Sequence, residues 1–143
     1  MGPHDPACLF CKIVAGQVPA SKVFETDFAV AFLDIDPVNL GHVLLVPKEH
    51  HATLADLPDD LAARLGSLVP RLARSVQAAT GADGLNLIVN NGVVAGQTVH
   101  HSHWHLIPRF EEDAVRWPWP HVAYEGDGLA GMRDRIALGL QGG

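Results

Sequence analysis

Three histidines at positions 101, 103 and 105 alternate with other residues, and this alternation is the strongest constraint on how the chain can fold. In an extended strand, side chains two residues apart lie on the same face, so the three imidazoles would line one side of a sheet. A solvated strand face normally carries threonine, lysine and glutamate instead. Three adjacent imidazoles place donors, acceptors and titratable nitrogens in one small region, which indicates a functional site.

The length of 143 residues predicts one domain with a sizeable core. The formal net charge of -6 argues against a nucleic-acid polymer or an anionic membrane as partner, whereas a small anionic ligand remains compatible with it. No apolar run reaches the ~18 residues of a membrane span, and residues 1–6 lack the pattern of a signal peptide. We therefore expect a cytoplasmic protein that does not cross a membrane.

Apolar periodicity predicts five strands and two helices. Leucines and valines at spacings of three and four between Pro58 and Gly81 indicate a long amphipathic helix, with two aspartates complementing the dipole at its start. A second, shorter apolar stripe runs from Leu129 to Leu140. We expect strands at residues 23–25, 28–33, 42–46 and 85–89 and in the histidine stretch itself.

The only two cysteines form the motif Cys8-Leu9-Phe10-Cys11. Such a pair is half of a tetrahedral zinc site, but it is also the form of a thioredoxin-like redox motif. The redox motif needs a preceding strand and a long following helix, whereas Gly16 ends any helix here within a turn or so. This context favours a metal whose remaining ligands are histidines, with two unliganded buried thiols or a redox pair as the alternatives.

Two further features have less specific meaning. His42, alone at the start of a predicted central strand, is interpreted as a structural hydrogen-bonding residue. The segment Trp117-Pro118-Trp119-Pro120 is incompatible with a helix interior or a paired strand, so we expect an extended segment that packs on the domain.

The segment His101-Ser102-His103-Trp104-His105-Leu106-Ile107 resembles the His-x-His-x-His-x-x signature of the histidine-triad (HIT) family of nucleotide hydrolases and transferases. Position 100 carries histidine where many relatives have an aromatic residue. Other segments resemble the family in the same order along the chain, namely 8–13, 31–37, 41–50, Asn90-x-Gly92 and Gly96-Gln97-Thr98.

The resemblance implies an α+β fold, with a five-stranded antiparallel sheet, one long helix and usually a two-fold homodimer. We expect a single domain over residues 1–143, with a core at about residues 8–110 and a C-terminal extension at 111–143. The family chemistry is cleavage of nucleoside 5'-phosphate derivatives at the α-phosphorus through a nucleotidyl-histidine. The expected substrates are purine nucleotides, such as adenosine phosphoramidates or dinucleoside polyphosphates.

Residue roles follow from the resemblance. His103, flanked by imidazoles on the same face, is assigned as the nucleophile. His105, Gln97 and Thr98 would contact the α-phosphate, with Asn90 and the Gly96 backbone completing that pocket. Asp34 would bind the ribose hydroxyls, and Phe10 and Ile35 would lie near the base.

The resemblance also implies a structural zinc site built from Cys8, Cys11, His50 and His101. Four protein ligands leave no coordination position for water, so such a metal would not take part in the chemistry. Two other classes of function stay open beside the hydrolase or nucleotidyl transferase. One is a nucleotide-binding regulatory protein with little turnover, and the other is a zinc-dependent scaffold.

Overall fold

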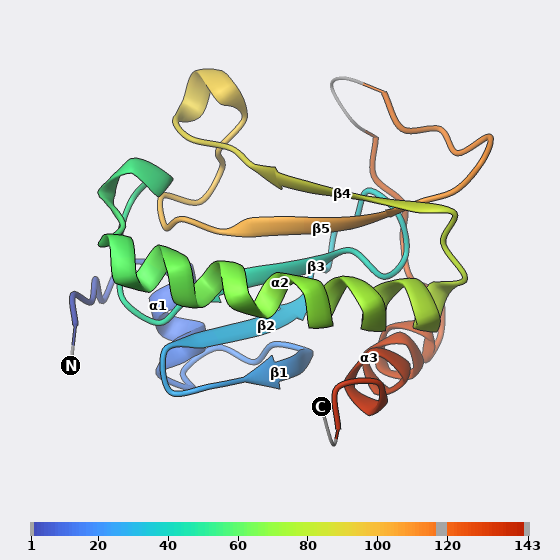
Figure 1. Ribbon diagram of the computed structural model, residues 1–143, viewed down its shortest axis with the longest axis horizontal. Coiled ribbons are helices and arrows are strands. Elements are labelled where there is room, and N and C mark those ends of the chain that lie inside the picture. The colour runs from blue at the N-terminus through green and yellow to red at the C-terminus, as the bar shows by residue number, and fades with distance from the viewer. Residues whose placement is uncertain (1, 117–119, 142–143) are drawn as a thin grey trace.

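The computed structural model describes residues 2–116 and 120–141 and shows a five-stranded antiparallel sheet with helices on both faces (Figure 1). The strand order is β1-β2-β3-β5-β4, so β1 and β4 are the edges of the sheet. The predicted α+β fold and the strand count are confirmed. The elements are α1 (Leu9–Val14), β1 (Lys22–Glu25), β2 (Ala29–Leu33), β3 (Val43–Pro47), η1 (Leu54–Asp56), α2 (Asp59–Thr80), β4 (Gly84–Val89), η2 (Val93–Ala95), β5 (Trp104–Arg109) and α3 (Gly128–Leu138).

The long helix α2 lies across one face of the sheet, with α3 beside it (Figure 1). Its apolar stripe buries Leu61, Leu65 and Leu72 against the strands. Pro58 is the N-cap, and Gly81 ends the helix in the left-handed region at φ 69°, which glycine adopts without a steric penalty. The predicted boundaries of this helix are confirmed.

All five residues of β2 and all five of β3 are buried, because each face of the sheet is covered. Side chains on one face, such as Leu33 and Leu45, join the core under α2 and α3. Those on the other face, such as Phe32 and Leu44, pack against Phe10 of α1. The central strands therefore place alternate side chains in two cores, and α1 closes the smaller of the two.

The histidine row is only partly a strand. β5 begins at Trp104, and the residues before it run alongside the chain that leaves β3, where Ser102 N–H donates to the carbonyl of His51 at 2.7 Å. This departure frees His101 from the sheet ladder. The predicted segment 117–120 lies outside the described residues except for Pro120. Among the helices of the described ranges, none is long and apolar enough to cross a membrane.

The C-terminal extension is anchored where it leaves β5. The Asp113 carboxylate accepts from Arg109 Nε at 2.8 Å and from Arg109 Nη2 at 3.0 Å. It also accepts from the backbone N–H of Phe110 and from Asn39 Nδ2. These donors, with Arg109 the strongest, hold the pKa of Asp113 well below its usual range. The extension is therefore fixed to the sheet at its first turn.

Candidate active site and metal-binding cluster

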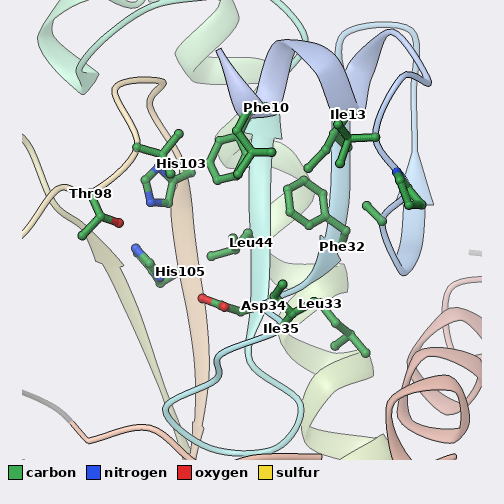
Figure 2. A pocket seen from close by; sticks show the side chains of 15 residues that line it. Phe10, Ile13, Phe32, Leu33, Asp34, Ile35, Leu44, Thr98, His103 and His105 are labelled. Atoms are coloured by element: carbon green, nitrogen blue, oxygen red, sulfur yellow. The ribbon is translucent and has the colours of Figure 1, made fainter. Parts of the chain in front are cut away.

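A pocket of about 240 Å³ lies beside α1, between strand β3 and the segment that leads into β5 (Figure 2). One end is apolar and the other carries the polar groups. The apolar end includes Phe10, Ile13, Phe32 and Leu44, and the polar end includes Asp34, Thr98, His103 and His105. Such a division suits a ligand with a flat apolar part joined to a hydroxylated or anionic part.

His103 presents one nitrogen to this pocket in a defined tautomer. Its Nδ1–H donates to the backbone carbonyl of His101 at 2.7 Å, so the lone pair of the neutral ring lies on Nε2. Burial lowers the pKa of His103, although the bond to the carbonyl opposes this shift. The imidazole is therefore neutral at pH 7, with a nucleophilic nitrogen beside the other polar lining residues.

His105 is oriented by a chain of hydrogen bonds through His42. The N–H of Val38 donates to His42 Nδ1 at 3.1 Å, which places the His42 proton on Nε2. That proton is donated to His105 Nδ1 at 2.9 Å, so His105 carries its own proton on Nε2. Burial, with a smaller contribution from His103, lowers the pKa of His105 to about 3, so the ring is a neutral donor. The prediction that His42 is a structural hydrogen-bonding residue is confirmed.

Asp34 lies within 3.8 Å of His42, and with His105 these residues form a group that resembles a metal site. A metal ligand needs a lone pair, however, and the N–H of Val38 already occupies the lone pair of His42 Nδ1. Nε2 must then carry the proton, so the donor set does not fit a cation. Val38, His42 and His105 form a chain of hydrogen bonds, and the Asp34 carboxylate lies beside it.

The Asp34 carboxylate lines the pocket with one oxygen already engaged. Oδ1 accepts from the N–H of Asp36 at 2.9 Å, which fixes the rotation of the carboxylate. Burial raises the pKa of Asp34, and the Asp36 bond partly offsets this. The next residue, Ile35, is 79% exposed although it also lines the pocket. Ile35, which was predicted to lie near the base of a nucleotide, therefore forms part of the open rim of the pocket.

The loop before the histidine row is braced by the Gln97 side chain. Its amide nitrogen donates to the carbonyls of Ala52 at 2.6 Å and Val99 at 3.0 Å, and its oxygen accepts from Gly92 N–H at 2.7 Å. Gly92 and Gly96 have φ of 91° and 101°, as expected for a loop that needs positive φ. Of the residues predicted to bind nucleotide, Phe10, Asp34, Ile35 and Thr98 line the pocket, whereas Asn90, Gly96 and Gln97 do not.

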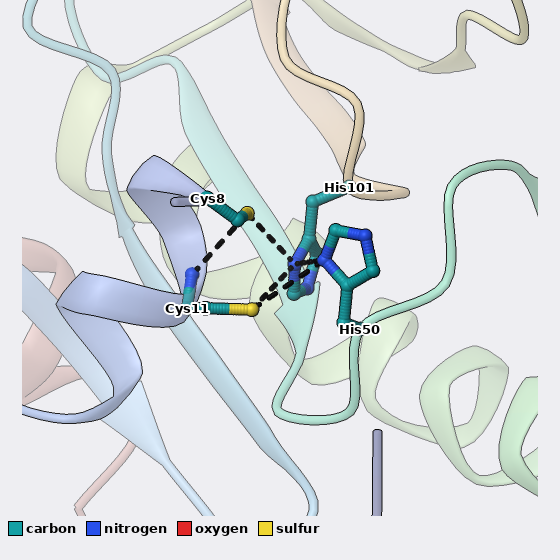
Figure 3. Close-up of side chains that lie close together, drawn as sticks. All are labelled: Cys8, Cys11, His50 and His101. Carbon is teal, nitrogen blue, oxygen red and sulfur yellow. Dashed lines mark hydrogen bonds between the residues drawn. The ribbon is translucent and has the colours of Figure 1, made fainter. Parts of the chain in front are cut away.

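A second group of side chains meets on the far side of α1 and could bind a metal (Figure 3). Cys8 Sγ lies 3.4 Å from His101 Nδ1, and Cys11 Sγ lies 3.4 Å from His50 Nδ1 and 3.6 Å from His101 Nδ1. The two histidine nitrogens are 3.2 Å apart. Around a tetrahedral zinc ion, neighbouring sulfur and nitrogen ligands would be about 3.5 Å apart and two nitrogens about 3.3 Å apart. These four distances therefore fit four of the six edges of such a tetrahedron, and all four ligand atoms lie within 4.8 Å of one another.

Backbone groups orient these ligands. His101 Nε2–H donates to the carbonyl of Pro47 at 2.8 Å, which leaves the lone pair of Nδ1 directed at the cluster. Cys11 Sγ accepts from the N–H of Asp5, and Cys8 Sγ accepts from the N–H of Cys11, each at 3.4 Å. Burial raises the pKa of the Cys11 thiol, so a bound cation would be needed to hold it as a thiolate. These hydrogen-bond partners could not be identified from the sequence, because they are backbone groups that do not depend on residue type.

Phe10 connects the cluster and the pocket. It lies between the two cysteines in α1, and its ring contacts His101 and His103 edge-on, with centroid separations of 5.8 and 5.0 Å. The same ring lines the apolar end of the pocket. Anything that fixes Cys8 and Cys11 therefore also fixes one wall of the pocket.

Comparison with known proteins agrees with this arrangement. A family model described as HIT domain matches residues 15–112. The chain belongs to the HIT domain family. The family resemblance of the histidine row is thus confirmed over most of the core, and the Cys8–Cys11 pair with its histidines is consistent with a zinc-type member.

Two curated relatives of this HIT protein are named as enzymes. The protein named adenylylsulfatase HINT3 of Arabidopsis thaliana is 44% identical over 108 residues, covering 76% of this chain. The alignment covers 55% of that protein, so this chain matches only about half of its length. Adenosine 5'-monophosphoramidase HNT1 of Saccharomyces cerevisiae is 38% identical over 139 residues, covering 96% of this chain and 85% of that protein.

One solved structure with the same fold is described as zinc-bound. The zinc-bound histidine triad family protein from Mycobacterium smegmatis is 33% identical and superposes with a TM-score of 0.80. The superposition covers 92% of this HIT protein and 94% of that chain. The fold assignment therefore extends well beyond the histidine motif.

Proposed function

We propose that this HIT protein is a nucleotide hydrolase or nucleotidyl transferase that cleaves nucleoside 5'-phosphate derivatives at the α-phosphorus. The observation that carries the proposal is the tautomer of His103, whose Nδ1–H bond to His101 O leaves Nε2 as a neutral nucleophile at the polar end of the pocket. The relatives named as a monophosphoramidase and an adenylylsulfatase support the same class of reaction.

In the first step, Nε2 of His103 attacks the α-phosphorus. A P–N bond forms while the bond from phosphorus to the leaving group breaks. The leaving group keeps the bonding electron pair and, where it is basic, takes a proton from solvent, which the attacking water of the second step gives back. The imidazole becomes positively charged in the nucleotidyl intermediate, and the carbonyl of His101 at 2.7 Å from Nδ1 stabilises that charge. Water then attacks the phosphorus, the P–N bond breaks, and His103 is regenerated as the nucleoside monophosphate leaves; a transferase would use another acceptor.

The remaining lining residues fit the parts of a purine nucleotide. His105 carries a proton on Nε2, so it can donate to a non-bridging phosphate oxygen, together with the Thr98 hydroxyl. Asp34 binds the ribose hydroxyls through the oxygen that the Asp36 N–H does not occupy. Phe10 and Ile35 flank the base. Gly96, through its positive φ, and Gln97, through its side-chain hydrogen bonds, hold the loop that carries Thr98 in shape.

Cys8, Cys11, His50 and His101 would hold one zinc ion, which fills four positions with protein ligands. Bound there, the ion would cross-link the N-terminal segment to the sheet, and with four protein ligands it would take no part in the phosphoryl chemistry. Thiolate ligands persist in a reducing compartment, and on this basis we place the protein in the cytoplasm.

A substrate panel tests the proposal. Purified protein is incubated with adenosine phosphoramidate, adenylyl sulfate and a dinucleoside polyphosphate, and release of AMP is followed by chromatography. We expect turnover of at least one compound. Calorimetric binding of AMP without turnover of any compound would instead support a nucleotide-binding regulatory protein, because the same pocket can bind without useful catalysis.

We also propose a homodimer. β4 is an edge strand whose outer backbone groups face no other strand of this sheet, and Leu87 on it is 45% exposed. A two-fold partner would cover both features. Light scattering at micromolar concentration is expected to give about twice the chain mass of 15.3 kDa. A mass equal to one chain across that concentration range would refute the dimer.

A further inference from the structure

Residues 121–124, here called the strap, hydrogen-bond to residues 34–41, here called the ribose loop. The strap belongs to the C-terminal extension that leads into α3, far from the loop in sequence (Figure 1). His121 Nδ1–H donates to the carbonyl of Asp36 at 2.6 Å. The N–H of Val122 donates to the carbonyl of Pro37 at 2.9 Å. Two consecutive strap residues therefore hold two consecutive carbonyls of the loop.

Tyr124 fixes the other end of the ribose loop. Its ring packs against the core beneath α2 and α3, and its hydroxyl accepts from the N–H of Gly41 at 2.7 Å. Gly41 has φ 100°, and a Cβ atom there would lie 2.4 Å from Thr80 Cγ2. The backbone at Gly41 thus has a conformation that other residues could not adopt without a clash. In this conformation the N–H of Gly41 points at the Tyr124 hydroxyl.

A third contact joins the loop to the start of the extension. Asn39 Nδ2 donates to the carbonyl of Pro108 at 2.8 Å and to Asp113 Oδ2 at 3.0 Å. Asp113 is in turn paired with Arg109 of β5. The extension therefore holds the ribose loop near its beginning, in its middle and at its end.

These contacts influence the orientation of Asp34 through one residue, Asp36. The N–H of Asp36 fixes Asp34 Oδ1, and the carbonyl of the same Asp36 is the acceptor for His121. Asp36 itself is exposed, and so is Ile35 beside it, so side-chain packing does little to hold this part of the loop. Its conformation depends on backbone hydrogen bonds, and the strap supplies three of them.

We propose that the strap holds the Asp34 carboxylate in the orientation that binds the two ribose hydroxyls, with His121 and Tyr124 as positioning residues. The inference rests on the proposed function, in which Asp34 binds ribose. A loop released from the strap samples other conformations, and the apparent affinity falls in proportion to the fraction of molecules in which Asp34 is aligned. The loss is confined to ligands that carry the ribose hydroxyls.

The test compares two ligands on the full-length protein by calorimetry: AMP and 2',3'-dideoxyadenosine 5'-monophosphate. The variants are His121→Ala, Tyr124→Phe and their combination, with Asp34→Ala as the reference for complete loss of ribose recognition. Each hydrogen bond of ordinary strength corresponds to a change of about three- to tenfold in an equilibrium constant. We expect the double variant to bind AMP about tenfold or more weakly and the dideoxy ligand within about twofold of wild type.

Val122→Ala is the matched control, because it truncates a strap side chain but keeps the backbone N–H that makes the bond. It is expected to bind both ligands as wild type does. In turnover of the best panel substrate, the strap variants are expected to raise KM while kcat changes less. Tyr124→Phe keeps the partly buried ring, so it tests the inference even if the double variant does not fold.

Two results would refute the positioning role of the strap without contradicting the proposed function. One is unchanged AMP affinity in both single variants, and the other is equal weakening of AMP and the dideoxy ligand, which a general loss of structure produces. Failure of wild-type protein to bind either ligand would overturn the proposed nucleotide site and the strap together.

Discussion

Replacing His103 by asparagine is expected to reduce turnover by about ten-thousandfold or more, the scale seen when an enzyme loses its nucleophile. His103 supplies the one neutral imidazole nitrogen whose tautomer is set by a backbone carbonyl and which lines the pocket beside Thr98 and His105. Asparagine keeps a polar side chain near the His101 carbonyl but provides no basic nitrogen that can form a P–N bond. Steady-state release of AMP from the best panel substrate measures the effect.

The fold and the nucleotide affinity of this variant should be largely intact. Circular dichroism melts and AMP calorimetry are the controls, since a lost nucleophile need not weaken product binding. His100→Ala is the matched substitution, because this imidazole is exposed and lies outside the pocket lining. It is expected to stay within about threefold of wild type, as surface changes away from a site usually have small effects. Activity of His103→Asn within tenfold of wild type on every substrate would refute the assignment.

The fold was predictable where one physical signal dominated. The leucine stripe of α2 and the glycine at position 81 gave both ends of the helix. The apolar runs gave the strands, because an apolar residue at every position of β2 and β3 is satisfied only between two covered faces. The alternation of His103 and His105 likewise placed both rings in one pocket, 4.8 Å apart between centroids.

The rest depended on tertiary contacts that no local pattern encodes. The strand prediction assigned the whole row to one face of a sheet, but β5 starts only at Trp104. The position of His101 beside Cys8, Cys11 and His50 was expected from the family resemblance alone, because these residues lie far apart in the sequence. His42 contacts His105 because β3 and β5 are neighbours in the sheet, a pairing that a lone histidine at a strand end does not reveal, so its effect on the tautomer of His105 could not be foreseen. Gln97 matched a family motif, yet its side chain bonds to its own loop.

The second large expected effect concerns the metal site, because His50 and His101 belong to the metal-binding cluster whereas His103 and His105 line the pocket. Purified protein is expected to carry about one zinc ion per chain, and Cys8→Ser should lower both the metal content and the melting temperature. The ligand atoms come from α1, from the chain after β3 and from the segment before β5, so the ion would cross-link three parts of the chain. Loss of a metal site costs several kcal/mol, and in a domain of this size each kcal/mol shifts Tm by about 3 °C. We therefore expect a fall of about 10 °C or more.

His50→Ala and His51→Ala form the sharpest comparison. His50 belongs to the cluster, whereas the adjacent His51 bonds to Glu49 at 2.9 Å and lies outside it. The first substitution should reduce metal content, measured by mass spectrometry after purification without chelator, and the second should not. Turnover by Cys8→Ser below its lowered Tm should fall much less than turnover by His103→Asn, because a four-ligand site holds the wall at Phe10 without touching the phosphate.

Two results would refute a structural metal. The first is the absence of metal from wild-type protein purified without chelator, which would leave Cys8 and Cys11 as unliganded thiols or a redox pair. Alternatively, a chelator could stop turnover at once while the circular dichroism melt stayed unchanged, which is the behaviour of a catalytic ion with an open coordination position. The geometry argues against both, because Pro47 O and the N–H of Asp5 already orient His101 and Cys11, and all four ligand atoms lie within 4.8 Å of one another.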